Sequence, residues 1–315
     1  MSEKILVLGA GIAGLGAAMA LGGGSAQVIL LDRDPPPPDA AYDEAFQHWE
    51  RKGVVQLRHS HVFLGKLFAL IRDRHPRLLA MLTEAGVREM TIRDGLPYAL
   101  RDGYAPAPGD EDLSILFSRR TTLELVMRRY ALTLPGVTFV TEALVRGLIF
   151  GERRNGARVV EGVRVERGGV LEEMRANVVV DATGRTTIMP DLLRAEGCAI
   201  AEEESPAGIL YYTRHYRLRE GKDEPARGEI PSAGDLGYIK YGIFPADHRH
   251  FSLTLAVPEI ETEIRKNIVY PETFDRIASL IPGAGRWTDL TRAEPVSKVY
   301  SMGNLKSLWR SYAKD

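Results

Sequence analysis

The feature that most constrains the fold is a run of glycines placed directly after a short apolar segment near the N-terminus. In EKILVLGAGIAGLGAAMAL, Lys4–Leu8 has the apolar character of a buried parallel strand and Ile12–Leu21 that of the helix that follows. Gly9, Gly11 and Gly14 form the pattern G-x-G-x-x-G between them. In such a turn the first glycine allows the tight bend, the second lets backbone approach a pyrophosphate, and the third lets the helix pack closely on the strand. The pattern therefore predicts a turn that holds a pyrophosphate at a helix N-terminus.

An acidic residue ends the next apolar segment, as a dinucleotide site requires. Gln27–Asp32 reads QVILLD and is predicted to be the second strand of a βαβ unit. Asp32 lies eighteen residues after Gly14, where a carboxylate accepts hydrogen bonds from ribose hydroxyls and disfavours a 2′-phosphate. NADP at this turn is therefore disfavoured, whereas FAD and NAD remain equally compatible with it. Arg33, the next residue, is included in the predicted cofactor site.

Composition and charge exclude several other classes of protein. The 315 residues are 44% hydrophobic and 26% charged, enough for one large domain or two smaller ones. A net charge of −1 lacks the basic field of a nucleic-acid binder. A single cysteine, Cys198, cannot form an intrachain disulfide, which favours a cytoplasmic location. Residues 5–24 are uncharged and largely apolar, but the glycine turn explains their seven glycines, so we expect no membrane span or signal peptide.

The rest of the chain predicts a mixed α/β protein whose second half is rich in strands. The four prolines at 35–38 predict a stiff loop. Helical periodicity covers His59–Ala85, with a break at His75-Pro76, and returns over Arg119–Leu134. The predicted strands are GVTFV, ALVRGLIF, a hairpin around Gly168-Gly169, Val178–Val180, and segments within GILYYTRHYRL, LGYIKYGIFP and HFSLTLAVP, followed by the predicted helices EIETEIRKNIV and ETFDRIASLI.

Two later segments resemble motifs of the FAD-dependent monooxygenases of the para-hydroxybenzoate hydroxylase type, called class A, and of their relatives in the same flavoprotein superfamily. Those proteins combine the N-terminal glycine turn with a midchain arginine on a helix. SRRTTLE matches this pattern through Arg120, or less closely through Arg119. They also have a strand that ends in an Asp-Gly-type motif, which VVVDATGRTT matches with Asp181, Gly184 and Arg185. The resemblance covers nearly the whole chain and implies FAD rather than NAD.

A third stretch, GVVQLRHSHVFL, is similar to a segment that lies beneath the flavin in bacterial members. It contains Gln56, Arg58, His59 and His61. The resemblance implies that at least one of them lies near the cofactor, and Gln56, Arg58 and His61 are included in the predicted cofactor site. Two histidines at i and i+2 diverge on a helix, and no cluster of carboxylates or cysteines accompanies them, so no metal site is predicted.

The resemblance implies an α/β fold in which a strand-rich substrate domain is inserted into a Rossmann-like FAD-binding domain. The expected FAD-binding domain comprises residues 1–85 and 113–187. The expected substrate domain comprises residues 86–112 and 188–300, and residues 301–315 return toward the FAD-binding domain.

The activity that the resemblance implies is an NAD(P)H-dependent monooxygenation. FAD, with NAD(P)H as a transient reductant, would hydroxylate or epoxidise a small organic substrate through a flavin hydroperoxide. Because the cofactor carries this chemistry, no catalytic side chain is predicted. Substrate specificity is expected on the strand-rich domain, where aromatic residues alternate with others. These residues are Tyr211, Tyr212, Tyr238, Tyr241 and Phe244.

Three alternatives stay open. A flavin-dependent reductase or saturase shares the cofactor fold. A halogenase is disfavoured because Trp49, Trp287 and Trp309 stand too far apart to form a Trp-x-Trp-x-Ile-Pro segment. A non-catalytic binding protein on a decayed flavin fold would explain why the family's C-terminal Gly-Asp motif is missing before Asp315. We expect instead that the sequence is a C-terminally truncated fragment of a longer enzyme, which by itself binds FAD weakly or not at all.

Overall fold

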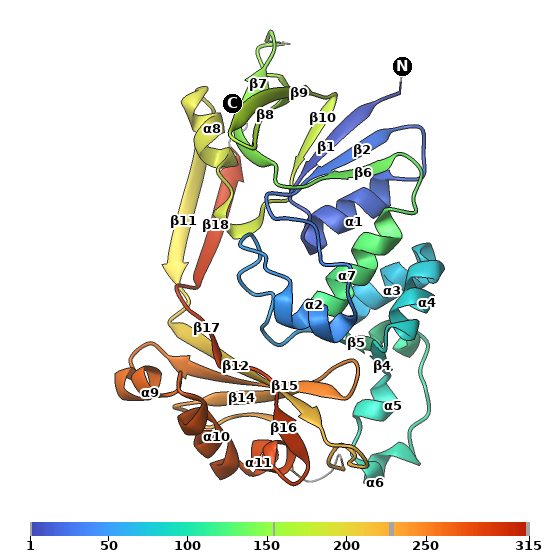
Figure 1. Ribbon diagram of the computed structural model, residues 1–315, viewed down its shortest axis with the longest axis vertical. Helices are drawn as coiled ribbons and strands as arrows, with labels where there is room; N and C mark the ends of the chain where they lie inside the picture. The colour runs from blue at the N-terminus through green and yellow to red at the C-terminus, as the bar shows by residue number, and fades with distance from the viewer. Residues whose placement is uncertain (1, 154, 227–229, 313–315) are drawn as a thin grey trace. The chain divides into compact units, whose positions relative to one another are not determined.

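The computed structural model divides into two compact units (Figure 1). It describes residues 2–153, 155–226 and 230–312. Unit 1 comprises Met1–Val55, Glu124–Glu203 and Leu308–Asp315, and unit 2 comprises Gln56–Leu123 and Glu204–Ser307. Both units are therefore built from segments that are far apart in the sequence.

These units divide the chain differently from the predicted domains. Residues 56–85 and 113–123, which the predicted FAD-binding domain includes, group with unit 2. Residues 188–203, which the predicted substrate domain includes, group with unit 1. Which unit binds cofactor and which binds substrate stays a prediction.

Unit 1 is built on a four-stranded parallel sheet with the strand order β10-β1-β2-β6. Its strands are β1 (Lys4–Leu8), β2 (Gln27–Leu31), β6 (Val137–Val140) and β10 (Val178–Asp181). Strand β1 lies between two neighbours and four of its five residues are buried, as expected for a parallel sheet covered on both faces. Leu8 is in register with Leu31 on one side and with Asp181 on the other, so the carboxyl ends of these strands form one edge.

One face of this sheet packs on a three-stranded antiparallel sheet, β7-β8-β9. Leu6 and Leu31 share a buried cluster there with Leu148 of β7 and Val163 of β8. The other elements of unit 1 are α1 (Ile12–Leu21), α2 (Tyr42–His48), β7 (Leu144–Phe150), β8 (Val160–Arg167), β9 (Val170–Arg175), η2 (Gly184–Thr186) and α8 (Met189–Ala195). Three elements have residues in both units: α7 (Arg120–Ala131) and the two strands of a separate ribbon, β11 (Ile200–Pro206) and β18 (Lys306–Tyr312).

Unit 2 contains an antiparallel sheet with the strand order β13-β14-β15-β12-β16, in which β17 also pairs with β12. Its elements are β12 (Ile209–Leu218), β13 (Ala233–Asp235), β14 (Lys240–Pro245), β15 (His250–Pro258), α9 (Thr262–Asn267), α10 (Pro271–Leu280), α11 (Pro282–Thr288), β16 (Ala293–Pro295) and β17 (Tyr300–Met302). The helices cover one face of this sheet, where Phe251 and Leu253 of β15 pack against Phe274 and Trp287.

Strand alternation separates the aromatic residues that are expected to face a substrate. Tyr212 and Tyr241 lie in the core beneath the helices and are only 3% and 9% exposed. Successive residues of a strand face opposite sides, so Tyr211 and Phe244 lie on the other face of the sheet. Tyr238 is exposed in the loop before β14. Packing in the core therefore explains two of these five residues.

A smaller sheet, β3-β5-β4, completes unit 2 with the helices around it. Its elements are β3 (Val62–Phe63), α3 (Gly65–Arg74), α4 (Pro76–Glu84), β4 (Arg88–Met90), α5 (Ile92–Gly95), α6 (Tyr98–Arg101), η1 (Asp110–Leu113) and β5 (Ile115–Phe117). The break at His75-Pro76 is confirmed, because α3 ends at Arg74 and α4 begins at Pro76. The prediction of helix from His59 is wrong for its first six residues, which form a turn and the short strand β3.

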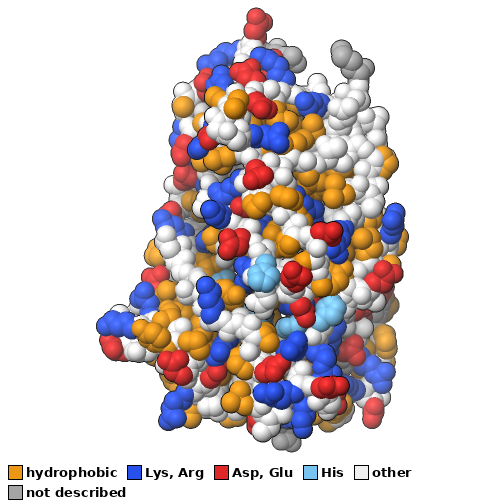
Figure 2. Space-filling view, viewed as in Figure 1, with side chains coloured by type: hydrophobic (Ala, Val, Ile, Leu, Met, Phe, Trp, Pro, Cys, Tyr) orange, Lys and Arg blue, Asp and Glu red, His pale blue; other side chains and the backbone are white. Residues whose placement is uncertain are grey.

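These sheets confirm the predicted mixed α/β class with a strand-rich second half. Throughout the described residues, every helix is too short or too polar to cross a membrane. On the face shown in Figure 2, basic and acidic side chains are interspersed with hydrophobic ones, in keeping with a net charge of −1.

Candidate functional site

The glycine turn joins β1 to α1 at the carboxyl edge of the parallel sheet. Gly9 has a φ of +95°, and a Cβ at this position would lie 2.7 Å from the carbonyl oxygen of Ala182. A Cβ on Gly14 would lie 1.8 Å from the carbonyl oxygen of Gly9. A Cβ on Gly11, in contrast, would meet only Val54, at 4.0 Å. Packing within the protein therefore excludes a side chain at Gly9 and Gly14, whereas space for a side chain or a ligand is left beside Gly11.

The N-terminus of α1 is suited to bind an anion. The helix is ten residues long, Gly11 caps it without a side-chain hydrogen bond, and its first turn holds no acidic residue. The first N–H groups of a helix have no partner within the helix, and the helix dipole favours negative charge there. The open cradle at Gly11 and these N–H groups fit the pyrophosphate of a dinucleotide such as FAD.

The second predicted motif lies directly beside this turn. Strand β10 ends at Asp181, and the backbone N–H of Ala182 donates a hydrogen bond of 2.9 Å to the carbonyl of Leu8. The Asp181 carboxylate accepts hydrogen bonds from Thr183 N and Oγ1 and from Thr187 Oγ1, at 3.0, 2.5 and 2.5 Å. Asp181 thus orders the loop that contacts the glycine turn. Next in that loop, η2 begins at Gly184, whose φ is +84°, and continues through Arg185.

Asp32 follows β2 and is buried with its carboxylate already engaged. Arg51 Nη2 donates to both carboxylate oxygens, at 3.2 and 3.0 Å, and Arg128 Nη1 donates to Oδ2 at 3.0 Å. The backbone N–H of Asp34 donates to Oδ1 at 3.3 Å. A carboxylate offers about four lone-pair positions, and these contacts use them all. Asp32 can therefore accept a ribose hydroxyl only after one of these contacts opens.

Arg51 is a residue of this site that the sequence motifs do not include. Its Nη1 donates to the carbonyl of Ala10 within the glycine turn, at 3.1 Å, and to Glu124 Oε2 at 2.6 Å. Its side chain is only 2% exposed. Arg51 thus ties the glycine turn to the buried carboxylates of Asp32 and Glu124. The surrounding sequence, HWERKG, is rich in charge and suggests an exposed segment, so local sequence carries no signal for this position.

Arg33 lies apart from this network. Its Nη2 donates to the carbonyl of Lys52 at 2.7 Å, in an exposed position. Arg33 therefore holds the loop after α2, and its predicted role toward a cofactor stays a prediction.

The other predicted residues, Gln56, Arg58, His61 and Arg120, belong to unit 2. His61 Nδ1 lies 2.8 Å from the carbonyl of His59, and its Nε2 lies 3.2 Å from Arg120 Nη1. Because Nδ1 must donate to the carbonyl and Nε2 must accept from the arginine, His61 is neutral. Burial and the charge of Arg120 lower the pKa of His61 to about 4. The structure thus brings His61 and Arg120 together, as a donor–acceptor pair.

Gln56 and Arg58 contribute through their backbone. The carbonyl of Gln56 accepts from the N–H of His59 at 3.1 Å. The carbonyl of Arg58 lies 2.9 Å from Nε2 of the buried His215. Both contacts help to fix the turn that leads to His61.

A row of hydroxyls fastens this turn to β12 and β15. His59 Nδ1 lies 3.0 Å from Thr213 Oγ1, which lies 2.7 Å from Thr254 Oγ1. Ser60 Oγ lies 2.7 Å from both Thr254 Oγ1 and Ser252 Oγ. These long-range contacts explain why the segment that precedes α3 is not helical. Burial lowers the pKa of His59 to about 4, so this residue is also neutral.

The predicted site residues therefore fall into two groups, and the role of each toward a cofactor stays a prediction. Unit 1 holds Gly9, Gly11, Gly14, Asp32, Arg33, Asp181 and Gly184, and unit 2 holds Gln56, Arg58, His61 and Arg120. Over the part of the chain that the structure describes, no group of three or more His, Cys, Asp or Glu residues is arranged to hold a metal ion.

The buried histidines predict that the chain loses stability in mild acid. Burial lowers the pKa of His59 and His61 to about 4 and that of His215 to about 3, from an ordinary value of 6.5. Between these values the unfolded chain binds more protons than the folded chain, so stability falls as the pH falls from about 6.5 toward 4. Each histidine contributes at most about 1.4 kcal/mol per pH unit.

Urea unfolding between pH 7 and pH 5 measures this effect. We expect the midpoint to fall steadily, and His61→Gln to reduce the slope by up to one proton. A midpoint that does not change over this range would contradict the burial of these neutral rings.

Three solved structures share this fold over nearly the whole chain. The flavin-dependent brominase Bmp2 covers 98% of this chain and 69% of its own, with a TM-score of 0.66 and 17% identity. PqsL, a probable FAD-dependent monooxygenase from Pseudomonas aeruginosa, covers 94% and 73%, with a TM-score of 0.62 and 16% identity. The myxobacterial chondrochloren halogenase CndH, described as a variant of FAD-dependent halogenases, covers 96% and 64%, with a TM-score of 0.64 and 17% identity.

These similarities establish the fold. The chain matches no model of a known protein family and no curated protein. At 16–17% identity, a shared fold does not carry activity with it, since one fold supports many functions. These three proteins are described as flavin-dependent or FAD-dependent, and any function of this chain has to be argued from its own site.

Proposed function

We propose that the chain is an FAD-dependent oxidoreductase and, more specifically, an NAD(P)H-dependent monooxygenase that hydroxylates or epoxidises a small organic substrate. The observation that carries the proposal is the meeting of two motifs distant in sequence. The DATG segment lies against the glycine turn, with the Ala182 carbonyl oxygen 2.7 Å from where a Gly9 Cβ would stand. Three solved structures of the same fold, two halogenases and a probable monooxygenase, are described as flavin-dependent or FAD-dependent.

The residues of unit 1 would hold the adenosine diphosphate half of FAD. The N–H groups that open α1 would donate to the pyrophosphate beside Gly11, where a side chain is missing. The guanidinium of Arg51 fixes the turn through the Ala10 carbonyl, while Asp32 and Glu124 balance its charge. Asp32 would bind the ribose once a contact from Arg51 or Arg128 gives way.

The second group of residues proposed to act on the cofactor or substrate is that of unit 2. Bound FAD would supply the redox chemistry, which includes reduction by NAD(P)H and activation of oxygen. His61 is held neutral against Arg120, so the arginine carries the positive charge of the pair at physiological pH. Arg120 is therefore suited to an anionic part of the cofactor or substrate. No side chain is assigned a catalytic role.

The direct test is a titration of the purified chain with FAD, followed by oxygen and NAD(P)H consumption with candidate substrates. Because the sequence predicts that this chain alone binds FAD weakly or not at all, we expect at most a weak titration with FAD, and oxygen uptake that depends on FAD, NAD(P)H and a substrate. Gly11→Val is expected to abolish FAD binding without unfolding the chain, because the new side chain fills the cradle where the nearest atom is 4.0 Å away. Gly16→Ala, in the same helix but with no heavy atom within 4 Å, is the matched control.

The outcomes separate the alternatives. A binding protein would consume neither oxygen nor NAD(P)H, and a saturase would reduce its substrate without oxygen. A halogenase would give a halogenated product only when bromide or chloride is added. FAD binding that survives Gly11→Val unchanged would contradict the placement of the pyrophosphate at this turn.

A further inference from the structure

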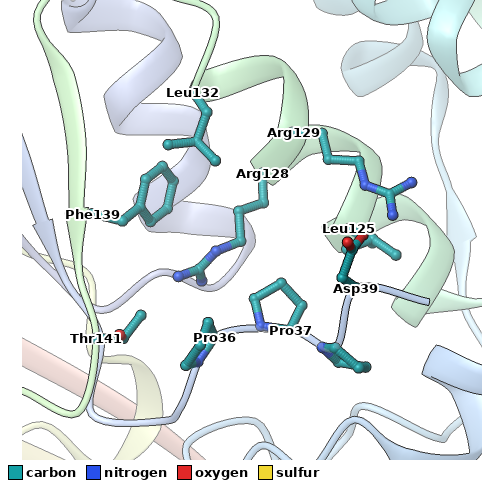
Figure 3. Close-up of a pocket in the computed structure, with 10 residues that line it drawn as sticks. Pro36, Pro37, Asp39, Leu125, Arg128, Arg129, Leu132, Phe139 and Thr141 are labelled. Carbon is teal, nitrogen blue, oxygen red and sulfur yellow. The ribbon is translucent and has the colours of Figure 1, made fainter.

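A hollow of about 350 Å³ opens in unit 1 between the proline loop after β2, helix α7 and strand β6 (Figure 3). Its walls are mainly apolar and include residues 36–38, Leu125, Leu132 and Phe139. Prolines have no backbone N–H, so this loop offers apolar rings and few donors. The volume lies at the lower end of the range of small-molecule sites, about 300–1,000 Å³. The hollow therefore suits a small ligand with an apolar body.

One end of the hollow holds a buried cation. Arg128 is 4% exposed, and its guanidinium lies 4.4 Å from the centroid of the Phe139 ring. Figure 3 shows this guanidinium pointing into the space beside Pro36 and Thr141. Its Nη1 donates to Asp32, and for the N–H groups of Nε and Nη2 the described residues provide no hydrogen bond. These open donors are suited to a carboxylate, because an arginine fork binds both oxygens at once.

At the opposite end of the hollow, no guanidinium among the residues drawn in Figure 3 points toward Arg128. Asp39 and Arg129 line that end, and in Figure 3 the Arg129 guanidinium points away from Arg128. Arg129 lies over the ring of Tyr42, with its guanidinium carbon 5.5 Å from the centroid. The hollow therefore offers one site for a single negative charge, at Arg128, and an apolar region between the two ends.

We propose that this hollow binds a small aromatic carboxylate, with its ring against Phe139 and the prolines and its carboxylate on Nε and Nη2 of Arg128. A single negative charge matches the one guanidinium that faces the hollow, whereas a phosphate ester would need more donors than these walls provide. The aromatic body follows from the flat ring of Phe139, with the apolar proline rings as the facing wall.

Arg128 also connects the hollow to Asp32. A carboxylate bound to Nε and Nη2 pulls the guanidinium away from Asp32. This weakens the contact of 3.0 Å between Nη1 and Asp32. Asp32 then regains a lone pair for another donor. If the proposed function holds, the ligand in the hollow and the dinucleotide at the glycine turn bind together and influence each other.

The test is calorimetric titration of the full chain with naphthoate and with its neutral analogue naphthamide. We expect naphthoate to bind about tenfold more tightly or better, because only the acid makes a charge-assisted hydrogen bond to Arg128. Leu132 lines the hollow and is 55% exposed, so changes there leave the fold intact. Leu132→Glu is expected to weaken naphthoate severalfold through repulsion, whereas Leu132→Gln is the uncharged control.

Arg128→Gln is expected to remove the preference for the acid over the amide, with a thermal melt to verify folding. Equal affinities for naphthoate and naphthamide in the unmodified chain, or an affinity that Leu132→Glu leaves unchanged, would overturn the proposal.

Competition with ADP is a separate experiment. Strict competition, in which the apparent Kd of naphthoate rises without limit as ADP is added, would show that the hollow is the adenosine end of the dinucleotide site and would overturn the proposal of a separate ligand. Naphthoate binding remains testable if ADP and FAD do not bind, so the two proposals can fail separately.

Discussion

Replacing Gly14 with alanine is expected to destabilise the chain by about 3 kcal/mol or more, because the new Cβ cannot be accommodated. It would lie 1.8 Å from the carbonyl oxygen of Gly9, which is a backbone atom that cannot rotate away. Gly9 is itself fixed, since its N–H donates to the carbonyl of Leu31 at 2.7 Å. Either α1 must move off β1 or the turn must open, and both changes expose buried surface of the parallel sheet.

Gly16 provides the matched control for this prediction. It lies in the same helix, two residues further on, and a Cβ there would meet no heavy atom within 4 Å. Gly16→Ala should therefore stabilise the chain by about 0.5–1 kcal/mol through helix propensity alone. Urea unfolding of both variants measures the difference. Similar midpoints for the two alanine variants would mean that α1 does not approach β1 as closely as the structure shows.

Asp247→Asn is expected to destabilise the chain by about 3–5 kcal/mol, because it leaves a buried arginine without its counter-charge. The Asp247 carboxylate is fully buried and accepts hydrogen bonds from Arg119 N at 2.7 Å, Nε at 3.0 Å and Nη2 at 2.6 Å. Thr122 Oγ1 donates to it at 2.8 Å. Burial alone would raise the pKa of Asp247, but the hydrogen bonds and charge of Arg119 hold it at about 2.

Asp73→Asn is the control for Asp247→Asn, and urea unfolding again measures both. Asp73 also accepts hydrogen bonds from an arginine, Arg72, but both side chains are exposed to solvent to a much greater extent. Water and side-chain entropy offset most of the attraction in such a pair, so the unfolding midpoint should stay near that of the unmodified chain. A chain that tolerates Asp247→Asn equally well would show that Arg119 is not buried as described.

Sequence predicts the elements whose signals are local. Strand β1, the glycine turn and helix α1 have the predicted ends, because the positive φ of Gly9 and the contact of Gly14 with Gly9 lie within the turn itself. The hairpin between β8 and β9 and the helix break at Pro76 depend equally on neighbouring residues. The resemblance predicts that the DATG segment lies near the glycine turn. In the structure, the parallel pairing of β1 with β10 brings the two segments together.

Sequence does not predict the features that depend on distant partners. The role of Arg51 rests on Asp32 and Glu124, which are 19 and 73 residues away. The turn at His59 replaces the predicted helix because its side chains bond to strands about 150 residues later. Periodicity also cannot tell which face of a sheet the helices will cover, which is why Tyr212 and Tyr241 are grouped in the prediction with residues of the opposite face.

The row of hydroxyls that joins His59 to Ser252 has a polarity that is set by the tautomer of one ring. In the neutral tautomer whose proton is on Nε2, Nδ1 of His59 accepts from Thr213, and each oxygen in turn accepts from the next, as far as Ser252. Protonation of the ring turns Nδ1 into a donor and flips every O–H in the row at once. The hydroxyl of Ser252 would then be released to donate elsewhere, so acidity at one ring would be felt at the far end of the row without any movement of the backbone.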